Sequence, residues 1–245
     1  MRLGMMQPYF LPYAGYFSLI HATDFWVIFD TPQYIRRGWV NRNRVLSEGK
    51  DGWKYIRIPV QHAPRETRIA DVLIDERTDW VQQLLQDLDV YQLRRAPYFP
   101  TVCSWLIEHL CAEENDGTSI RPMTTVLIRL LEAVCRYIGL PFHFEVFSSM
   151  SLTLPEVNDP GQWSYEVSRA LGATHYINAP GGRGIFDPQL FAASGVQLSF
   201  LEPDLTEYPQ RGTEFVPGLS IIDLMMWNSP EEVLRLISNY QLVDP

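Results

Sequence analysis

The sequence is poor in lysine and cysteine and has no long apolar run. Of its 20 basic residues only Lys50 and Lys54 are lysines, so arginine carries nearly all the positive charge. The three cysteines, which lack metal-ligand spacing, predict reduced thiols in a cytoplasmic protein. No apolar stretch reaches the length that crosses a bilayer, and the first ten residues lack the pattern of a secretory signal. We therefore expect a cytoplasmic protein without a membrane span.

The charge of the chain is unevenly distributed. The net charge of −9 argues against a broad nucleic-acid surface, because phosphate contacts need basic residues. The segment 31–46 nevertheless contains four arginines and no acid. Such a segment predicts either a local site for an anion or a solvated loop whose arginines pair with the excess carboxylates elsewhere, and the missing acids favour the anion site.

Strand and helix patterns alternate along most of the chain. A short buried strand at 2–7, a helix at 14–22 and a second buried strand at 25–30 predict a parallel pair joined by a crossover. The middle is helical, with an exposed loop at 112–122, and alternation returns after 141. We predict an α/β fold with a Rossmann-like, mostly parallel sheet. Its parts are an N-terminal part of the core (1–75), a helical insertion (76–140) and a C-terminal part of the core (141–245).

Three segments follow predicted strands, where open α/β sheets bind ligands: 7–16, 30–44 and 178–187. We expect them to converge. The first is similar to the phosphate-binding turn of nucleotidylyltransferases and pantothenate synthetases, in which H-x-G-H follows the first strand. Here Tyr13 and Tyr16 replace the two histidines, and tyrosine cannot supply the imidazolium charge that stabilises a leaving pyrophosphate. The similarity therefore supports a related fold more than it supports ATP chemistry.

The second and third segments contain candidate anion-binding groups. The arginines of the second segment are Arg36, Arg37, Arg42 and Arg44. Their forked guanidinium groups suit a phosphate or diphosphate, with Tyr34 and Trp39 available to stack on a base or sugar. In the third segment, three glycines surround Arg183, which predicts either an anion-binding loop or a plain turn.

Two acids occupy apolar surroundings. Asp30 ends the second buried strand, and Asp223 interrupts the apolar run "LSIIDLMMW". An acid in such a place is either a base with a raised pKa or a structural acid with bonded partners. No histidine pair has metal-ligand spacing, and no Ser/His/Asp order stands out, so we predict no metal site.

Four blocks of the sequence, in this order, resemble the WbqC-like protein family: "QPYFLPYAGYFSLI", "FDTPQYIRRGWVNRNRV", "YINAPGGRGIFDP" and "EYPQRGTEFVPGLSIIDLM". They lie towards both ends of the chain, and the helical middle matches only loosely. Here "PQY" stands where the family usually carries "VQF". The resemblance implies an association with bacterial surface-polysaccharide (O-antigen) gene clusters and an activity as a glycine or aminoacyl transferase.

Together these observations lead to a transferase hypothesis. The enzyme would form an amide on an amino sugar linked to a nucleotide, from an acyl or aminoacyl donor that includes charged tRNA. Asp30 is the first candidate base and Asp223 the second. The proposed substrate-binding residues are Gln7, Tyr9, Tyr13, Tyr16, Gln33, Arg36, Arg37, Trp39, Asn41, Arg42, Asn43, Arg183, Tyr208 and Gln210. No organic cofactor is implied.

Two alternatives stay open at this point. One is an ATP-dependent ligase or a nucleotidylyltransferase-like enzyme, which would release pyrophosphate from ATP. The other is a non-catalytic protein that binds a nucleotide sugar or assembles with partners in the same pathway. An anionic ligand is common to all three hypotheses, and the sequence predicts no oligomeric state.

Overall fold

A six-stranded sheet forms the centre of the computed structural model, which describes residues 1–111 and 121–245. Of the predicted loop at 112–122, residues 112–120 lie outside the described part of the chain. The spatial order is β5-β2-β1-β6-β7-β8, with β8 antiparallel to β7 and the other neighbours parallel. The strands are β1 (Arg2–Met6), β2 (Phe25–Ile28), β5 (Phe144–Val146), β6 (His175–Asn178), β7 (Gln197–Pro203) and β8 (Tyr240–Val243).

Counted in chain order, these strands follow the arrangement 3-2-1-4-5-6. This is the order of dinucleotide-binding Rossmann folds, in which the ligand lies beyond the carboxyl ends of the strands. The predicted α/β class with a mostly parallel, Rossmann-like sheet is confirmed. The strand order reverses at β1, so the residues that follow β1, β2 and β6 are the first place to look for a site.

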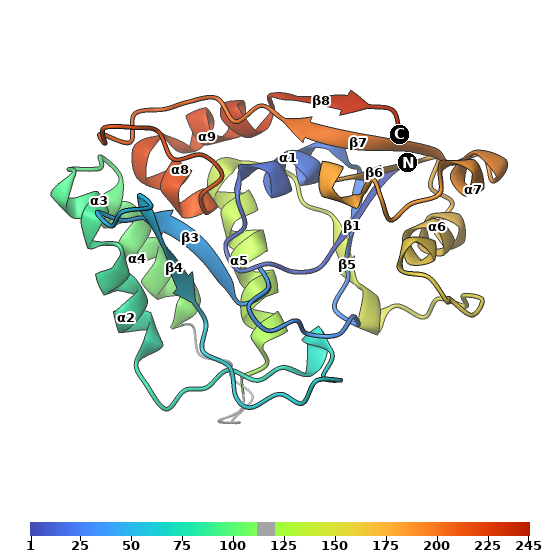
Figure 1. The fold of residues 1–245 in the computed structure, drawn as a ribbon, viewed down its shortest axis with the longest axis horizontal. Coiled ribbons are helices and arrows are strands. Elements are labelled where there is room, and N and C mark those ends of the chain that lie inside the picture. The colour runs from blue at the N-terminus through green and yellow to red at the C-terminus, as the bar shows by residue number, and fades with distance from the viewer. Residues whose placement is uncertain (112–120) are drawn as a thin grey trace.

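Helices cover both faces of the sheet (Figure 1). Strand residues alternate between the faces: Val27 packs with the side chains of α6 and α7, whereas Trp26 and Ile28 pack with those of α1 and α5. The α1 face also carries α8 and α9. The bounds are α1 (Ala14–Ala22), α5 (Met123–Ile138), α6 (Pro160–Ala170), α7 (Pro188–Ala193), α8 (Ile221–Trp227) and α9 (Pro230–Ile237).

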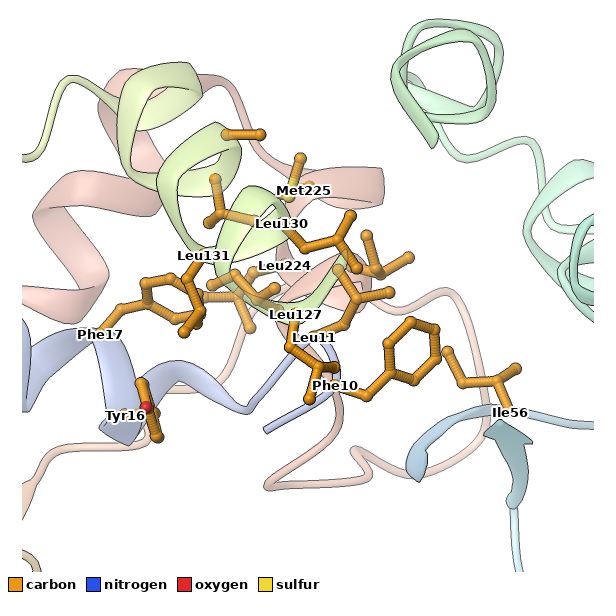
Figure 2. Close-up of a cluster of buried hydrophobic side chains, with 14 of the residues drawn as sticks. Phe10, Leu11, Tyr16, Phe17, Ile56, Leu127, Leu130, Leu131, Leu224 and Met225 are labelled. Carbon is orange, nitrogen blue, oxygen red and sulfur yellow. The ribbon is translucent and has the colours of Figure 1, made fainter. Parts of the chain in front are cut away.

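A hairpin and several helices lie between β2 and β5 in the chain. The hairpin strands are β3 (Arg42–Leu46) and β4 (Trp53–Arg57), and they are followed by α2 (Trp80–Asp87), α3 (Asp89–Leu93) and α4 (Phe99–Leu110). Buried side chains of the hairpin and of these helices join those of α1, α5 and α8 in one continuous hydrophobic core. Figure 2 shows part of this core, in which Phe10 lies between Ile56 of β4 and the side chains of Leu127 and Leu224.

Three segments take a form that their local sequence pattern does not specify. The arginine-rich stretch ends in strand β3, and the last residues form strand β8. The segment 69–75, a possible strand by its pattern, forms a 3-10 turn at Ile69–Asp71 followed by isolated bridges at Leu73 and Ile74. The form of this last segment depends on partners elsewhere in the chain, since Ile74 pairs with Val60 and Leu73 with Pro122.

The loop after β1 is held between the hairpin and the start of α8. Asn43 donates its side-chain amide to the carbonyls of Phe10 (3.1 Å) and Leu11 (2.9 Å). The hydroxyl of Ser220 donates to the Leu11 carbonyl (2.7 Å), and the Ile221 amide donates to the carbonyl of Pro12. These bonds satisfy the polar groups of an otherwise buried loop and fix the hairpin beside it.

Candidate functional site

One face of the β3–β4 hairpin is basic and aromatic. Arg42 lies opposite Arg57, and Arg44 opposite Tyr55. Residues directly opposite in an antiparallel pair share a face, so these side chains project together, while the buried Val45 faces the core. We define the basic aromatic face as Trp39, Arg42, Arg44, Trp53, Tyr55 and Arg57.

Aromatic rings and backbone carbonyls hold the guanidinium groups of this face. The Arg42 guanidinium lies 4.1 Å from the centroid of the Tyr55 ring and donates to the carbonyls of Gly38 and Arg37. The Arg44 guanidinium lies 5.1 Å from the ring centroid of Trp53 and donates to Gly218. Because stacking on rings leaves the edges of a guanidinium accessible, such groups remain able to bind an anion.

No carboxylate neutralises these arginines. Among the described residues, Arg36, Arg37, Arg42, Arg44 and Arg57 form no ion pair with an acid. By contrast, arginines elsewhere do, among them Arg2, Arg68, Arg77, Arg94, Arg121, Arg169, Arg183 and Arg235. The sequence allowed the arginine-rich segment to pair with the excess acids of the chain, and the structure does not form those pairs. The segment is therefore a concentration of positive charge that attracts anions.

A cavity of about 470 Å³ borders the same face, between the hairpin turn and the segment 212–217. Arg44 and Trp53 line it together with Lys50 and Arg94. The Arg94 guanidinium is paired with Glu48 at 2.8 Å. Arg44 thus joins the basic aromatic face to a second hollow of mixed charge.

A larger cavity lies on the other side of the arginine-rich segment. Gln33, Arg36, His62 and Arg65 are among the residues that line this space of about 690 Å³, which we call the loop cavity. Burial raises the pKa of the Tyr34 phenol, and the charges of Arg36 and Arg42 oppose that rise. Tyr34 therefore lies near both guanidinium groups and connects the loop cavity with the basic aromatic face.

A third hollow, the edge pocket, lies at the carboxyl ends of β1 and β2 and has a volume of about 380 Å³. Gln7 follows β1, and Phe29 and Thr31 follow β2. The opposite wall is the start of α6. The lining residues are Gln7, Phe29, Thr31, Pro32, Val157, Asn158, Asp159, Pro160 and Trp163. Pro32 lines this pocket and the next residue, Gln33, lines the loop cavity, so one stretch of chain separates the two hollows.

Asp30 lies between two lining residues of the edge pocket, but its own side chain is buried, with 2% exposed. Its carboxylate accepts hydrogen bonds from the amide (3.0 Å) and the hydroxyl (2.6 Å) of Ser148. The Asp30 carbonyl accepts from the amide of Ala70 at 2.8 Å. In this arrangement Asp30 joins the end of β2 to the turn after β5 and to the 3-10 turn, and so fixes the wall of the pocket.

Asp223 is fully buried and has three donors. It accepts hydrogen bonds from the hydroxyls of Tyr91 (2.7 Å) and Tyr208 (2.5 Å) and from the side-chain amide of Gln210 (2.8 Å). Burial raises the pKa of the Asp223 carboxyl, and the three hydrogen bonds oppose that rise. Tyr91 in turn accepts from the amide of Leu46. The network joins α8, α3, β3 and the segment 208–216.

Several predicted substrate-binding residues are structural in their contacts. Tyr16 is buried and donates its hydroxyl to the Gln7 carbonyl at 3.0 Å. Asn41, also buried, donates to the carbonyl of Ile58, and Asn43 holds the loop after β1. Arg183 pairs with Glu202 at 2.8 Å.

The remaining predicted residues are more open. Tyr9 and Tyr13 are half-buried beside the buried Tyr16 ring, and burial raises the pKa of both phenols. Arg37 is exposed and adopts a positive φ of 63°, which turns the chain towards β3. Of the predicted residues, Gln7 lines the edge pocket, Gln33 and Arg36 line the loop cavity, Trp39 and Arg42 belong to the basic aromatic face, and Tyr208 and Gln210 belong to the buried network around Asp223. The others lie outside these four places.

Sequence reasoning missed residues that distant elements contribute. Trp53, Tyr55 and Arg57 alternate along "WKYIR", and this period of two already indicated a common face. Asn158 and Trp163 belong to the start of α6, whose proximity to Gln7 depends on the sheet topology. Within the described parts of the chain, no group of three or more histidine, cysteine, aspartate or glutamate side chains is placed to hold a metal ion. No helix there is long and apolar enough to cross a membrane.

Comparison with known proteins agrees with the family resemblance. The family model described as "WbqC-like protein family" matches residues 7–235. An uncharacterized protein of Mycobacterium tuberculosis, Rv1507c, is 27% identical over 237 residues, which cover 91% of this chain and 92% of that protein. No solved structure matches the chain. Because the family model matches most of the chain, from the loop after β1 into α9, the chain belongs to the WbqC-like protein family.

Proposed function

We propose that this protein is a transferase that forms an amide on a nucleotide-linked amino sugar, in the synthesis of a surface polysaccharide. The observation that carries the proposal is the cluster of arginines without acidic partners on the basic aromatic face and in the loop cavity. A diphosphate is the ligand that several forked guanidinium groups bind best. Trp39, with 42% of its surface exposed, is available to stack on a base.

The reaction would be an acyl transfer. The amine of the sugar attacks the carbonyl of an activated ester or thioester, the alcohol or thiol departs, and the amine loses a proton to a base. An aminoacyl ester on the end of a tRNA satisfies this chemistry. The net charge of −9 would then limit RNA contacts to the acceptor end near the arginines.

A second candidate function is binding of the nucleotide sugar without catalysis. The observation that favours it is the state of the two predicted bases: Asp30 is buried against Ser148, and Asp223 is saturated by three donors. The ATP-dependent alternative has less support, because Tyr16, at a histidine position of the H-x-G-H turn, is buried and bonded to the backbone.

Calorimetric titration with uridine and thymidine diphosphates, their sugar derivatives and ATP tests the proposal. We expect a nucleotide sugar to bind, and Arg42→Gln and Arg57→Gln each to weaken binding at least tenfold because each removes a charge-assisted contact. The matched control is Arg77→Gln, an arginine that is 86% exposed and paired with Asp75. Binding that survives both changes, or binding of ATP alone, would contradict the proposal.

Turnover separates the two candidate functions. The best-binding nucleotide amino sugar is incubated with aminoacyl-tRNA and with acyl thioesters, and amide formation is followed by mass spectrometry. Amide product that disappears in Arg42→Gln supports the transferase. Tight binding without product from any donor supports the non-catalytic protein.

A further inference from the structure

We infer that the edge pocket is a saccharide site that holds a pyranose ring bearing an amino group. The inference rests on the proposed function for its link to the nucleotide, but the pocket itself is distinct from the arginine sites. None of the residues that line it is a lysine, arginine or histidine. A pocket lined by no cationic side chain is unsuited to a phosphate, so we expect it to bind an uncharged or cationic part of the ligand.

The pocket contains a fixed aromatic platform. The Trp163 ring lies 5.7 Å from the ring of Phe29 at a tilted angle of 52° and 5.6 Å from that of Phe147 at an edge-on angle of 87°. Phe29 and Phe147 also meet each other edge-on at 5.2 Å. Three mutually packed rings hold the indole in place, and a rigid indole is a surface on which the apolar C–H face of a sugar ring can pack.

Unused polar groups surround this platform. Among the described residues, no partner donates to or accepts from the side-chain amides of Gln7 and Asn158 or the hydroxyl of Thr31, and all three residues line the pocket. One carboxylate oxygen of Asp159 accepts from the amide of Gly161 at 2.8 Å, which leaves the other oxygen for a ligand. Two amides, a hydroxyl and a carboxylate around a ring offer both donors and acceptors, as the hydroxyl groups of a saccharide require.

The start of α6 is already capped, which argues against an anion in the pocket. Asp159 caps the helix through Gly161, and the Gln162 side chain accepts from the amides of Asn158 (3.1 Å) and Asp159 (3.3 Å). The backbone donors that would attract a phosphate are therefore engaged, and Asp159 adds a negative charge. A protonated amino group is the substituent that this carboxylate selects.

The position of the pocket suits a sugar joined to a diphosphate. Its volume of about 380 Å³ accommodates one monosaccharide, and only the segment around Pro32 and Gln33 separates it from the arginines of the loop cavity. The pocket also lies at the carboxyl ends of β1 and β2, where sheets of this topology bind ligands. Asp159, rather than Asp30, is then the carboxylate beside the amino group.

The test compares uridine diphosphate, its glucose and glucosamine derivatives, and free methyl glucosaminide. We expect the glucosamine derivative to bind at least tenfold more tightly than the diphosphate alone. Trp163→Leu should abolish this gain while leaving the affinity for uridine diphosphate unchanged. Asp159→Asn, which preserves the helix cap, should abolish the preference for glucosamine over glucose. Circular dichroism confirms that each variant is folded.

The free sugar separates this inference from the proposed function. Its binding is followed by ligand-observed NMR at millimolar concentration in the wild type and in Trp163→Leu. If the free sugar binds in a way that depends on Trp163 and no nucleotide binds, the saccharide site is supported and the nucleotide-linked function is overturned. If the sugar group does not strengthen nucleotide binding, or if Trp163→Leu does not weaken sugar binding, the saccharide site alone is overturned. If neither the free sugar nor any nucleotide binds, the saccharide site and the nucleotide-linked function are both overturned.

Discussion

Asp223 illustrates how a single residue can look catalytic in a sequence and be structural in a fold. An acid within an apolar helix is costly to bury unless donors compensate it. Here Tyr91, Tyr208 and Gln210 supply the compensation from three separate segments. All three groups donate, so the network is matched to the ionised carboxylate.

Asp223→Asn tests this role. The amide keeps one acceptor oxygen but places an N–H group against donors, so we expect the free energy of unfolding to fall by about 1–3 kcal/mol. Urea unfolding followed by tryptophan fluorescence measures the loss, and calorimetry should find nucleotide binding unchanged. A variant with wild-type stability but no turnover would instead identify Asp223 as a base.

At the scale of elements, the packing of β1 against β2 depends on a glycine, Gly4, which lies opposite Trp26. Gly4 of β1 lies where a β-carbon would come within 2.6 Å of Cε3 in the ring of Trp26. Trp26 is 1% exposed and also contacts Tyr16, with ring centroids 5.2 Å apart. The glycine therefore leaves room for the largest side chain of β2 to pack against the neighbouring strand.

Gly4→Ala should destabilise the protein by about 1–3 kcal/mol, because the added methyl group forces Trp26 or the strand to shift. The control is Gly181→Ala, since no described atom lies within 4 Å of the added carbon there. We expect that control to be neutral or slightly stabilising. Equal unfolding midpoints for the two variants in urea would show that Trp26 relaxes without cost.

At the scale of the whole molecule, the sequence predicted the parts that are governed by local pattern. The β1–α1–β2 unit, α5 and the helices after Ser220 follow from apolar periodicity. The pairing of β3 with β4 and the return of β8 against β7 depend on partners that periodicity does not specify. Arg42 and Arg44 of the candidate site were predicted from a local cluster of charge, whereas Arg57 was missed and the wall of the edge pocket opposite Gln7 comes from residues about 150 positions away.

Stability should also depend on pH in the alkaline range. Burial raises the pKa of Tyr91 and of Tyr208 well above the ordinary value of 10.0, and the nearby Asp223 charge raises both further. Burial likewise raises the pKa of Tyr176 to about 12. The unfolded chain releases these protons near pH 10, so their contribution is complete below that pH and is lost as the pH rises.

Urea unfolding at pH 8.5 and 10.5 measures this loss. We expect the free energy of unfolding to be lower at pH 10.5. The decrease should be smaller in Tyr208→Phe, which removes one titrating group, although that variant starts from a lower stability because Asp223 loses a donor. An identical decrease in both proteins would show that the Tyr208 phenol does not contribute.

The strand order places β5 and β8 at the two margins of the sheet, and these strands are three and four residues long. A strand of typical length has five or six residues, and an unpaired margin of that length is a template on which another chain can add. The short margins here offer few consecutive backbone groups for such addition. The inner strands β2, β1, β6 and β7 are each paired on both sides, so these apolar strands are shielded from the intermolecular β-pairing that leads to fibrils.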